Sequence, residues 1–187
     1  MPIDLTRQFK PISIAVLTIS DSRGRAEDTS GDILAECVAN AGHQLRDRAI
    51  VKDSVDVIVQ QLRHWIADPQ TDCVISTGGT GLTGRDVTPE AFARVWDKEI
   101  PGFGELFRFL SYQSIGTSMV QSRACAGVAS GTYLFALPGS PGAVKDGWNG
   151  ILVTQLDSRH RPCNFVELMP RLREPLHAGL KQMGETA

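Results

Sequence analysis

The chain has 187 residues, of which 42% are hydrophobic, and its formal net charge is −2. This length suits one domain with a sizeable core, and the near-neutral charge argues against binding to nucleic acid or to an anionic membrane. The four cysteines form no C-x-x-C pair, and the sequence shows neither a signal peptide nor an apolar run long enough to span a bilayer. We therefore expect a cytoplasmic protein with reduced thiols.

The first half of the chain alternates between strand-like and helical patterns. The first strand-like run, ISIAVLTI, is apolar at nearly every position, which is typical of a strand covered on both faces in a parallel sheet. The helical runs repeat their apolar residues every three or four positions. The expected elements are strands at residues 12–19, 43–51 and 72–76 and helices at residues 28–41 and 55–66.

The second half of the chain is predicted to contain three helices and a hairpin. The helices are expected at residues 89–96, 103–112 and 143–154. Residues 124–136 form two strand-like halves around Ser130-Gly131, which is typical of a hairpin turn.

Strands and helices of these lengths, taken in this order, predict an α/β fold. We expect three layers (αβα), with a central, mostly parallel sheet, helices on both faces and a small β-hairpin. The sequence shows no internal repeat and no domain linker, so one domain is expected to span residues 1–187. Residues 1–11 and 175–187 are expected to be tails.

Residues 76–89, STGGTGLTGRDVTP, are the most informative stretch of the sequence. Four glycines follow the third predicted strand, and consecutive N–H groups in such a loop form a concavity that binds anions. Asp86 in the same loop would repel a bare phosphate, so it indicates a divalent cation between protein and phosphate. Thr88 and Pro89 are expected to be the N-cap and the first residue of the next helix.

Two nucleotide-binding motifs nearly match this loop, and a purely structural turn would also explain it. The segment from Gly79 to Gly84 matches G-x-G-x-x-G, but the helix signal comes four residues after the last glycine, which disfavours a Rossmann site. The same spacing is similar to a P-loop, but Arg85-Asp86 stands where that motif needs a lysine and a hydroxyl residue.

Other loops at predicted strand ends carry hydroxyl, glycine and acidic residues, namely residues 28–32, 52–54 and 138–142. In an open parallel sheet, the loops at the carboxyl ends of the strands converge on one crevice. The predicted helix start near Ser30 adds a partial positive charge beside hydroxyl groups, which suits a phosphate.

Asp53 and Asp86 are the carboxylates of interest because each follows a predicted strand. Taken singly, each is explained as a cap, Asp53 of the helix after Ser54 and Asp86 of the turn into Thr88. Taken together with the hydroxyl- and glycine-rich loops, the pair favours a magnesium–phosphate site.

Five segments of the chain carry a family resemblance: TGGTG (77–81), RDVTPE (85–90), EIPGFGE (99–105), Ser122-Arg123 and LPGSP (137–141). In combination they resemble the MoaB/Mog family of molybdenum cofactor biosynthesis proteins, which includes the molybdopterin adenylyltransferases and a domain of gephyrin. The resemblance covers residues 12–154. The segments DTSGD and RHRPCNFVELMPRL are most similar to the B-type branch, MoaB.

The resemblance implies a homotrimer or homohexamer that works beside other molybdenum cofactor biosynthesis proteins. It also implies molybdopterin as a substrate, whose terminal phosphate is joined to AMP from ATP with release of pyrophosphate. Asp53 and Asp86 would be the catalytic residues and would hold Mg²⁺. The residues expected to bind the substrates are Ser30, Thr77, Gly78, Gly79, Thr80, Gly81, Gly139 and Ser140.

Three functions follow from these observations. The first is a molybdopterin adenylyltransferase. The second is a non-catalytic protein that binds molybdopterin or a nucleotide beside a separate adenylyltransferase. The third is an interaction scaffold of the gephyrin kind, which the lack of linkers and further domains in this sequence disfavours.

Overall fold

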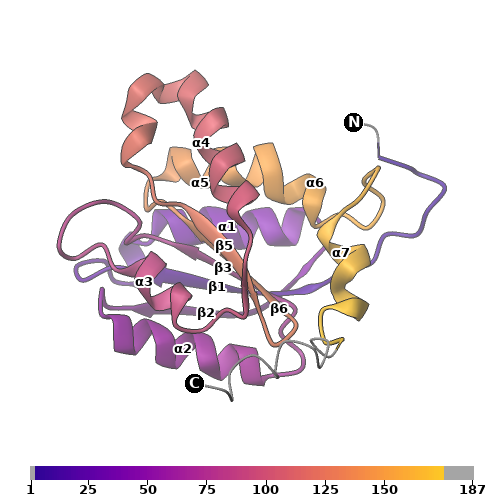
Figure 1. Cartoon of the computed structure of the whole chain (residues 1–187), viewed down its shortest axis with the longest axis horizontal. Coiled ribbons are helices and arrows are strands. Elements are labelled where there is room, and N and C mark those ends of the chain that lie inside the picture. The colour runs from indigo at the N-terminus through magenta and orange to yellow at the C-terminus, as the bar shows by residue number, and fades with distance from the viewer. Residues whose placement is uncertain (1–2, 175–187) are drawn as a thin grey trace, which may run out of the picture.

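A six-stranded mixed sheet forms the centre of the computed structural model, which describes residues 3–174 (Figure 1). In spatial order the strands are β2 (Gln44–Val51), β1 (Ser13–Ile19), β3 (Cys73–Thr77), β6 (Thr132–Leu137), β5 (Cys125–Ala129) and β4 (Lys98–Glu99). The first four run parallel to one another, and β5 and β4 extend one edge of the sheet in antiparallel pairs.

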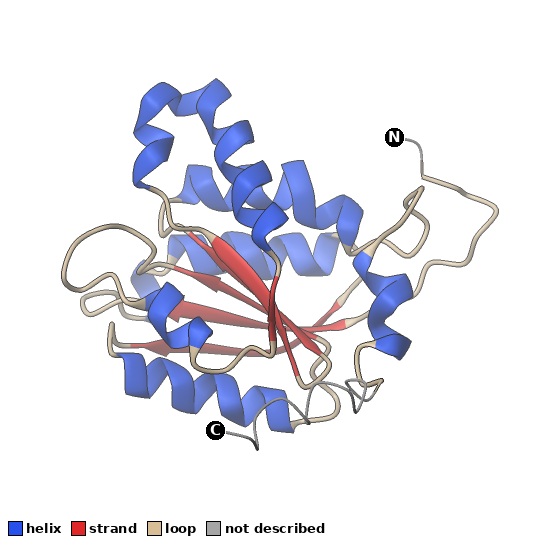
Figure 2. Cartoon of the chain, in the orientation of Figure 1, coloured by secondary structure: helices blue, strands red, loops and turns tan. Residues whose placement is uncertain are grey.

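Helices cover both faces of the sheet (Figure 1, Figure 2). One face carries α1 (Thr29–Asn40), α4 (Pro101–Ile115), α5 (Pro141–Gly147), α6 (Val153–Gln155) and α7 (Phe165–Leu168). The other face carries α2 (Val55–Ala67) and α3 (Thr88–Ala93). A π-helical turn, Trp148–Leu152, joins α5 to α6, and 3-10 turns occupy Arg25–Glu27, Gly116–Gln121 and Met169–Arg171.

The alternation of side chains along β1 explains the three layers. Ile14 and Val16 pack into the cluster under α1, α4 and α5, whereas Ala15 and Leu17 pack into the cluster under α2 and α3. All four side chains are fully buried, as expected for a strand that is apolar on both faces. The predicted three-layer α/β fold is therefore confirmed.

Most of the expected elements are present, with shifts in their bounds. The hairpin is confirmed, because Ser130 and Gly131 have φ values of 48° and 90°, the left-handed conformation that a two-residue hairpin turn requires. Its second strand, β6, is also a central strand of the sheet, since it pairs in parallel with β3. The strand β4 was not predicted, because two residues are too few to show a period.

The prediction that Thr88 caps α3 is wrong. The helix already includes Thr88, and Val87 occupies the cap position without a side-chain hydrogen bond. The Thr88 hydroxyl donates instead to the carbonyl oxygen of Gly78 at 2.8 Å, and its N–H donates to that of Gly79 at 3.0 Å. This threonine therefore connects the glycine loop to α3 through two hydrogen bonds. No local sequence pattern predicts this contact.

The structure describes one of the two expected tails. Residues 3–11, which lie within the tail expected at residues 1–11, run against the body of the domain, where Arg7 forms an ion pair with Glu167. The other expected tail, residues 175–187, lies outside the described residues. In the described part of the chain, no helix is long and apolar enough to cross a membrane.

Asp28 and Arg48 form a buried ion pair. Their side chains are 0% and 6% exposed, and Nη2 of Arg48 lies 2.5 Å from Oδ2 of Asp28. Asp28 also caps α1, because its Oδ1 accepts the N–H of Gly31 at 3.0 Å. The hydroxyl of Thr18 donates to its Oδ2 at 2.8 Å. One carboxylate thus ties α1 to β1 and β2.

Removing one partner of this pair is expected to destabilise the fold strongly. Arg48→Met leaves the Asp28 carboxylate buried without its cation, and an unpaired buried charge costs about 3–5 kcal/mol of unfolding free energy. The double variant Asp28→Asn, Arg48→Met is expected to lose less, because no buried charge remains. Urea unfolding measures both variants. A loss below about 1 kcal/mol in Arg48→Met, the size of a surface ion pair, would contradict the prediction.

Candidate functional site

The loops after β1, β2, β3 and β6 meet at one edge of the sheet, because these four strands are parallel. The chain passes from β1 to β2 on one side and then to β3 on the other, so a topological switch point lies between β1 and β3. Such points are where open α/β sheets bind ligands. A cavity of about 720 Å³ lies at this edge, a size typical of small-molecule and cofactor sites.

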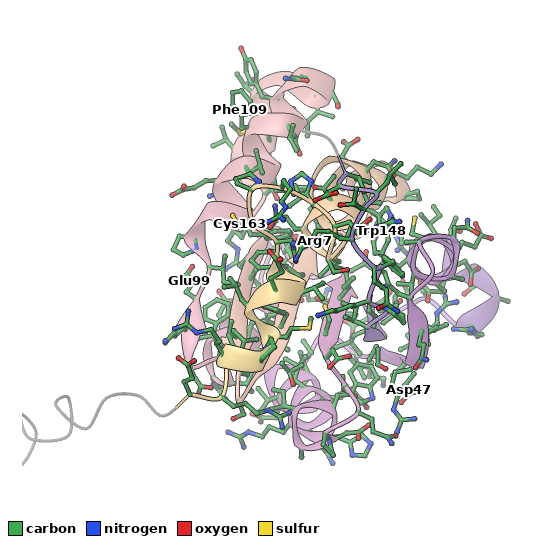
Figure 3. The ribbon with its side chains drawn as sticks, turned by 90° about the vertical axis from the view of Figure 1, so that its right-hand side faces the viewer. Arg7, Asp47, Glu99, Phe109, Trp148 and Cys163 are labelled. Atoms are coloured by element: carbon green, nitrogen blue, oxygen red, sulfur yellow. The ribbon has the colours of Figure 1, made fainter. Side chains whose placement is uncertain are left out.

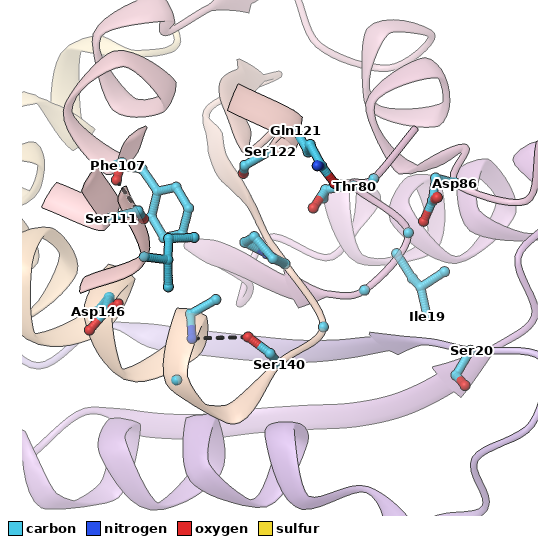
Figure 4. Close-up of a pocket in the computed structure, with 18 of the residues that line it drawn as sticks. Ile19, Ser20, Thr80, Asp86, Phe107, Ser111, Gln121, Ser122, Ser140 and Asp146 are labelled. Carbon is cyan, nitrogen blue, oxygen red and sulfur yellow. Dashed lines mark hydrogen bonds between the residues drawn. The ribbon is translucent and has the colours of Figure 1, made fainter. Parts of the chain in front are cut away.

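Eight of the ten residues that the sequence assigned to metal or substrate binding line this cavity (Figure 4). They are Asp53, Gly78, Gly79, Thr80, Gly81, Asp86, Gly139 and Ser140. The other two, Ser30 and Thr77, are buried and do not line it. Their hydroxyls donate to the carbonyl oxygens of Gly139 and Pro138, each at 2.9 Å, so they fix the turn after β6.

Only glycine fits at the first two positions of the loop after β3. Gly78 has a φ of 107°, and a Cβ there would lie 2.2 Å from the carbonyl oxygen of Ile19. Gly79 has a φ of 65°, and a Cβ there would lie 2.4 Å from the hydroxyl oxygen of Thr88. The glycines are therefore needed both for their left-handed conformation and for the close approach of the backbone.

The N–H groups of this loop are not all available to a ligand. The N–H of Gly78 donates to the carbonyl oxygen of Leu137 at 3.0 Å, and the Asp86 carboxylate lies against Gly81, whose N–H helps to hold the pKa of Asp86 low. The N–H groups of Gly79 and Thr80 have no hydrogen-bond partner among residues 3–174. The anion-binding part of the loop is therefore narrower than the sequence suggested, and it centres on these two amides.

The Asp86 carboxylate closes its own loop. Its Oδ2 accepts the hydroxyl of Thr83 at 2.6 Å and the N–H of Thr83 at 2.8 Å. These hydrogen bonds, with the N–H of Gly81 and the charge of Arg123, hold the pKa of Asp86 below its usual range. Asp86 is therefore ionised at neutral pH at the rim of the cavity.

Asp53 has a different environment and is not a helix cap. Helix α2 begins after Ser54 without a side-chain cap. Burial raises the pKa of Asp53, and the negative charges of Asp21 and Asp86 raise it further, against an opposing hydrogen bond from the backbone of Asp21. The Asp53 carboxylate thus lies in a region of net negative charge, which Arg85 offsets only in part.

Asp53 and Asp86 fit a divalent cation that is shared with a bound phosphate. Oδ1 of Asp53 lies 3.1 Å from the position of a Cβ at Gly79, and Oδ2 of Asp86 lies 2.8 Å from that at Gly81, so both carboxylates lie against the loop. In the described residues, no three His, Cys, Asp or Glu side chains converge as a closed metal site would require. Mg²⁺ needs only one or two carboxylates together with water and phosphate oxygens.

The opposite wall of the cavity comes from α4, which the sequence did not predict as part of the site. Phe107, Ser111, Ser114 and Ile115 line it, and Figure 4 shows Phe107 and Ser111 across the cavity from Thr80 and Asp86. On the helix, Phe107 and Ser111 have the spacing of an ordinary core face, so no sequence signal separated them from the core. An apolar wall of this kind suits a flat ring.

Arg23 is the one cationic side chain among the described residues that line the cavity, and three aspartates, Asp53, Asp86 and Asp146, also line it. The Arg23 side chain is exposed, and Nη1 donates to the carbonyl oxygen of Gly139 at 3.1 Å. A guanidinium in this position can also pair with phosphate oxygens. No sequence pattern marks Arg23, because it lies in an irregular loop.

Comparison with known proteins points to the same region of the chain. Residues 15–158 match the family described as a probable molybdopterin binding domain. The chain is 49% identical over 161 residues to molybdenum cofactor biosynthesis protein B of Escherichia coli K12, covering 86% of this chain and 95% of the relative. It is 44% identical over 142 residues to the Bacillus subtilis protein of the same name, covering 75% and 84%.

Solved structures share the fold over most of the chain. A crystal structure of molybdenum cofactor biosynthesis protein B has a TM-score of 0.81 at 37% identity, covering 90% of this chain and 100% of that one. The tungsten cofactor synthesizing protein MoaB from Pyrococcus furiosus has a TM-score of 0.74 at 34% identity, covering 88% and 99%. The chain therefore belongs to the MoaB/Mog family of molybdenum cofactor biosynthesis proteins and carries its molybdopterin-binding domain.

Proposed function

We propose that this protein binds molybdopterin in the cavity and joins its terminal phosphate to AMP from Mg²⁺–ATP, with release of pyrophosphate. One observation carries the proposal: Asp53 and Asp86 share the cavity with the unpartnered N–H groups of Gly79 and Thr80. Carboxylates that hold a cation, next to amides that hold an anion, are the parts that nucleotidyl transfer requires.

In this reaction, an oxygen of the molybdopterin phosphate attacks the α-phosphorus of ATP. The bond from that phosphorus to the bridging oxygen of the β-phosphate breaks, and its electron pair leaves with pyrophosphate. Asp53 and Asp86 would hold Mg²⁺, which would neutralise phosphate charge when bound. The N–H groups of Gly79 and Thr80 would hold phosphate oxygens, and the Arg23 guanidinium would pair with the charge of the departing pyrophosphate.

The wall formed by α4 would bind the rings of the substrates. Both molybdopterin and ATP carry a flat, fused ring system beside phosphate groups. Phe107 lies across the cavity from Thr80 of the glycine loop (Figure 4), and Ile115 also lines the cavity, so a ring against α4 would have its phosphate on the side of the loop.

A second candidate function is binding without transfer. One observation favours it, because Oδ2 of Asp86 already accepts two hydrogen bonds from Thr83 and is less available to a cation. Such a protein would hold molybdopterin or a nucleotide in the same cavity beside a separate adenylyltransferase. Magnesium-dependent nucleotide binding distinguishes both candidates from a scaffold, and pyrophosphate release distinguishes the enzyme from the binder.

Replacing either aspartate is expected to abolish most of the transfer. Asp86→Asn and Asp53→Asn are each expected to lower the rate of pyrophosphate release at least about 100-fold, because each removes one of the charges that stabilise the transition state. The rate is measured with purified protein, molybdopterin, ATP and Mg²⁺. Asp56→Asn is the matched control, since Asp56 is 90% exposed on α2, three residues from Asp53. Full activity of Asp86→Asn at saturating Mg²⁺ would show that the assignment is wrong.

The raised pKa of Asp53 has a consequence for stability. Below the ordinary pKa of aspartate, about 3.9, the carboxyl is protonated in both states and has no effect. Above the raised pKa of the folded state, the partly buried charge destabilises the fold. We expect Asp53→Asn to raise the urea midpoint at pH 7 without Mg²⁺, and this gain to fade as the pH falls through the raised pKa of the folded state toward about 4. A lower midpoint at pH 7 would show that the charge of Asp53 is compensated.

We also propose that the protein is a homotrimer or homohexamer with α4 at its interface. Five large apolar side chains on α4 and the following 3-10 turn are between 42% and 71% exposed, namely Leu106, Phe109, Tyr112, Ile115 and Val120. Helix α4 projects beyond the sheet (Figure 1), and Phe109 lies near its projecting end (Figure 3). Monomeric soluble proteins rarely gather so much exposed apolar surface in one place.

Phe109→Asp is expected to break this assembly, because it places a charge in an apolar contact. Sedimentation velocity should then show a species near the chain mass of 20.3 kDa, where the unchanged protein sediments as a multiple of it. Val57→Asp is the matched control, since Val57 is a singly exposed apolar residue on α2, 40% exposed. An unchanged protein that sediments as a monomer would exclude the assembly, and a Phe109→Asp variant that stays oligomeric would exclude this interface.

A further inference from the structure

Arg123 lies just before β5, and every nitrogen of its guanidinium has a partner, two in the glycine loop and one on α3. Nε donates to the carbonyl oxygen of Gly81 at 2.7 Å, and Nη2 donates to that of Asp86 at 2.6 Å. Nη1 forms an ion pair with the carboxylate of Glu90 on α3. The backbone N–H of Arg123 adds a fourth contact, to the carbonyl oxygen of Thr80 at 2.9 Å.

These contacts hold the loop at both ends of its exposed tip. Residues 82–85 are exposed to solvent, and they separate Gly81, beside the free amides, from Asp86, the candidate metal ligand. Arg123 bonds to both of these residues at once, so it fixes the distance between the anion-binding and cation-binding parts of the site.

The positive charge of Arg123 also favours the ionised forms of Asp86 and Glu90. Its guanidinium contributes to holding the pKa of Asp86 below its usual range, after the hydrogen bonds from Thr83 and Gly81. Its hydrogen bond is the main cause that lowers the pKa of Glu90, which therefore stays ionised and holds the guanidinium in place.

The arrangement requires arginine in particular. Three acceptors lie around one planar group, and a guanidinium presents five N–H donors in fixed directions. A lysine at position 123 would keep the positive charge but offers a single nitrogen, which cannot reach Gly81, Asp86 and Glu90 in three separate directions.

We propose that Arg123 is a positioning residue that acts through Asp86: with Glu90 orienting it, Arg123 braces the loop so that the Asp86 carboxylate meets the divalent cation and phosphate beside Gly79 and Thr80. This inference rests on the proposed function, because it assigns Asp86 to the cation. It adds a role for a residue that does not line the cavity.

The test is a titration of Mg²⁺ in the presence of ATP, with binding followed by calorimetry. Arg123→Lys is expected to raise the half-saturating Mg²⁺ concentration about 10- to 100-fold, the usual effect of removing a partner that orients a metal ligand. Arg94→Ala is the matched control, because Arg94 is 59% exposed and pairs with Asp56 away from the loop. Unchanged Mg²⁺ dependence in Arg123→Lys would overturn the proposal.

A double-mutant cycle separates positioning from a general loss of structure. If Arg123 acts through Asp86, Arg123→Lys adds little to the loss already caused by Asp86→Asn. Losses that multiply independently would overturn the proposal. Should Arg123→Lys fail to fold by circular dichroism, Glu90→Gln tests the same brace, with a smaller shift expected that also disappears in the Asp86→Asn background.

If the double-mutant cycle shows that Arg123 and Asp86 are coupled but no pyrophosphate is released, the proposed activity is rejected and the role of Arg123 stands. Pyrophosphate release with no coupling would reject the role of Arg123 alone.

Discussion

Gly78 and Gly79 leave β3 at a point where the chain has no room for a side chain. The backbone of Gly78 passes beside the carbonyl oxygen of Ile19 at the end of β1, and Thr88 closes over both glycines from α3. Because the loop must turn tightly here, it brings Asp86 to the edge of the sheet where β2 also ends. The cavity, the positions of Asp53 and Asp86 and the free N–H groups of Gly79 and Thr80 therefore all depend on the absence of two Cβ atoms.

The buried carboxylate in the structural core of the fold is paired with a cation, whereas Asp53 in the site lies among other carboxylates. In the structural core, the buried Asp28 carboxylate is matched by Arg48 and by the cap of α1, so its burial holds elements together. In the site, burial and the neighbouring carboxylates raise the pKa of Asp53, and Arg85 and the backbone of Asp21 offset this only in part. A site left electrostatically incomplete at some expense of stability is what a protein needs when the missing charge arrives with the ligand.

Much of the fold was predictable because it depends on local patterns. The apolar run of β1 indicated a strand covered on both faces, and Ser130-Gly131 indicated the hairpin turn. The prediction failed where two distant segments share a contact. Thr88 carries the signature of a helix cap, yet its hydroxyl is used by Gly78, ten residues earlier. The α4 wall had no signature, because Phe107 follows the same helical spacing as a core residue.

The sequence by itself determined the order of the elements, the glycine-rich and acidic loops at the strand ends, and the family. Parallel strands must end at the same edge, so these features were enough to place eight of ten expected residues on one cavity. The tertiary structure decided which groups are free there. It turned Ser30 and Thr77 inward, left the N–H groups of Gly79 and Thr80 without a partner among residues 3–174, and set Arg123 against Asp86. Such partners are 37 to 109 residues apart, and only the pairing of strands brings them within hydrogen-bonding distance.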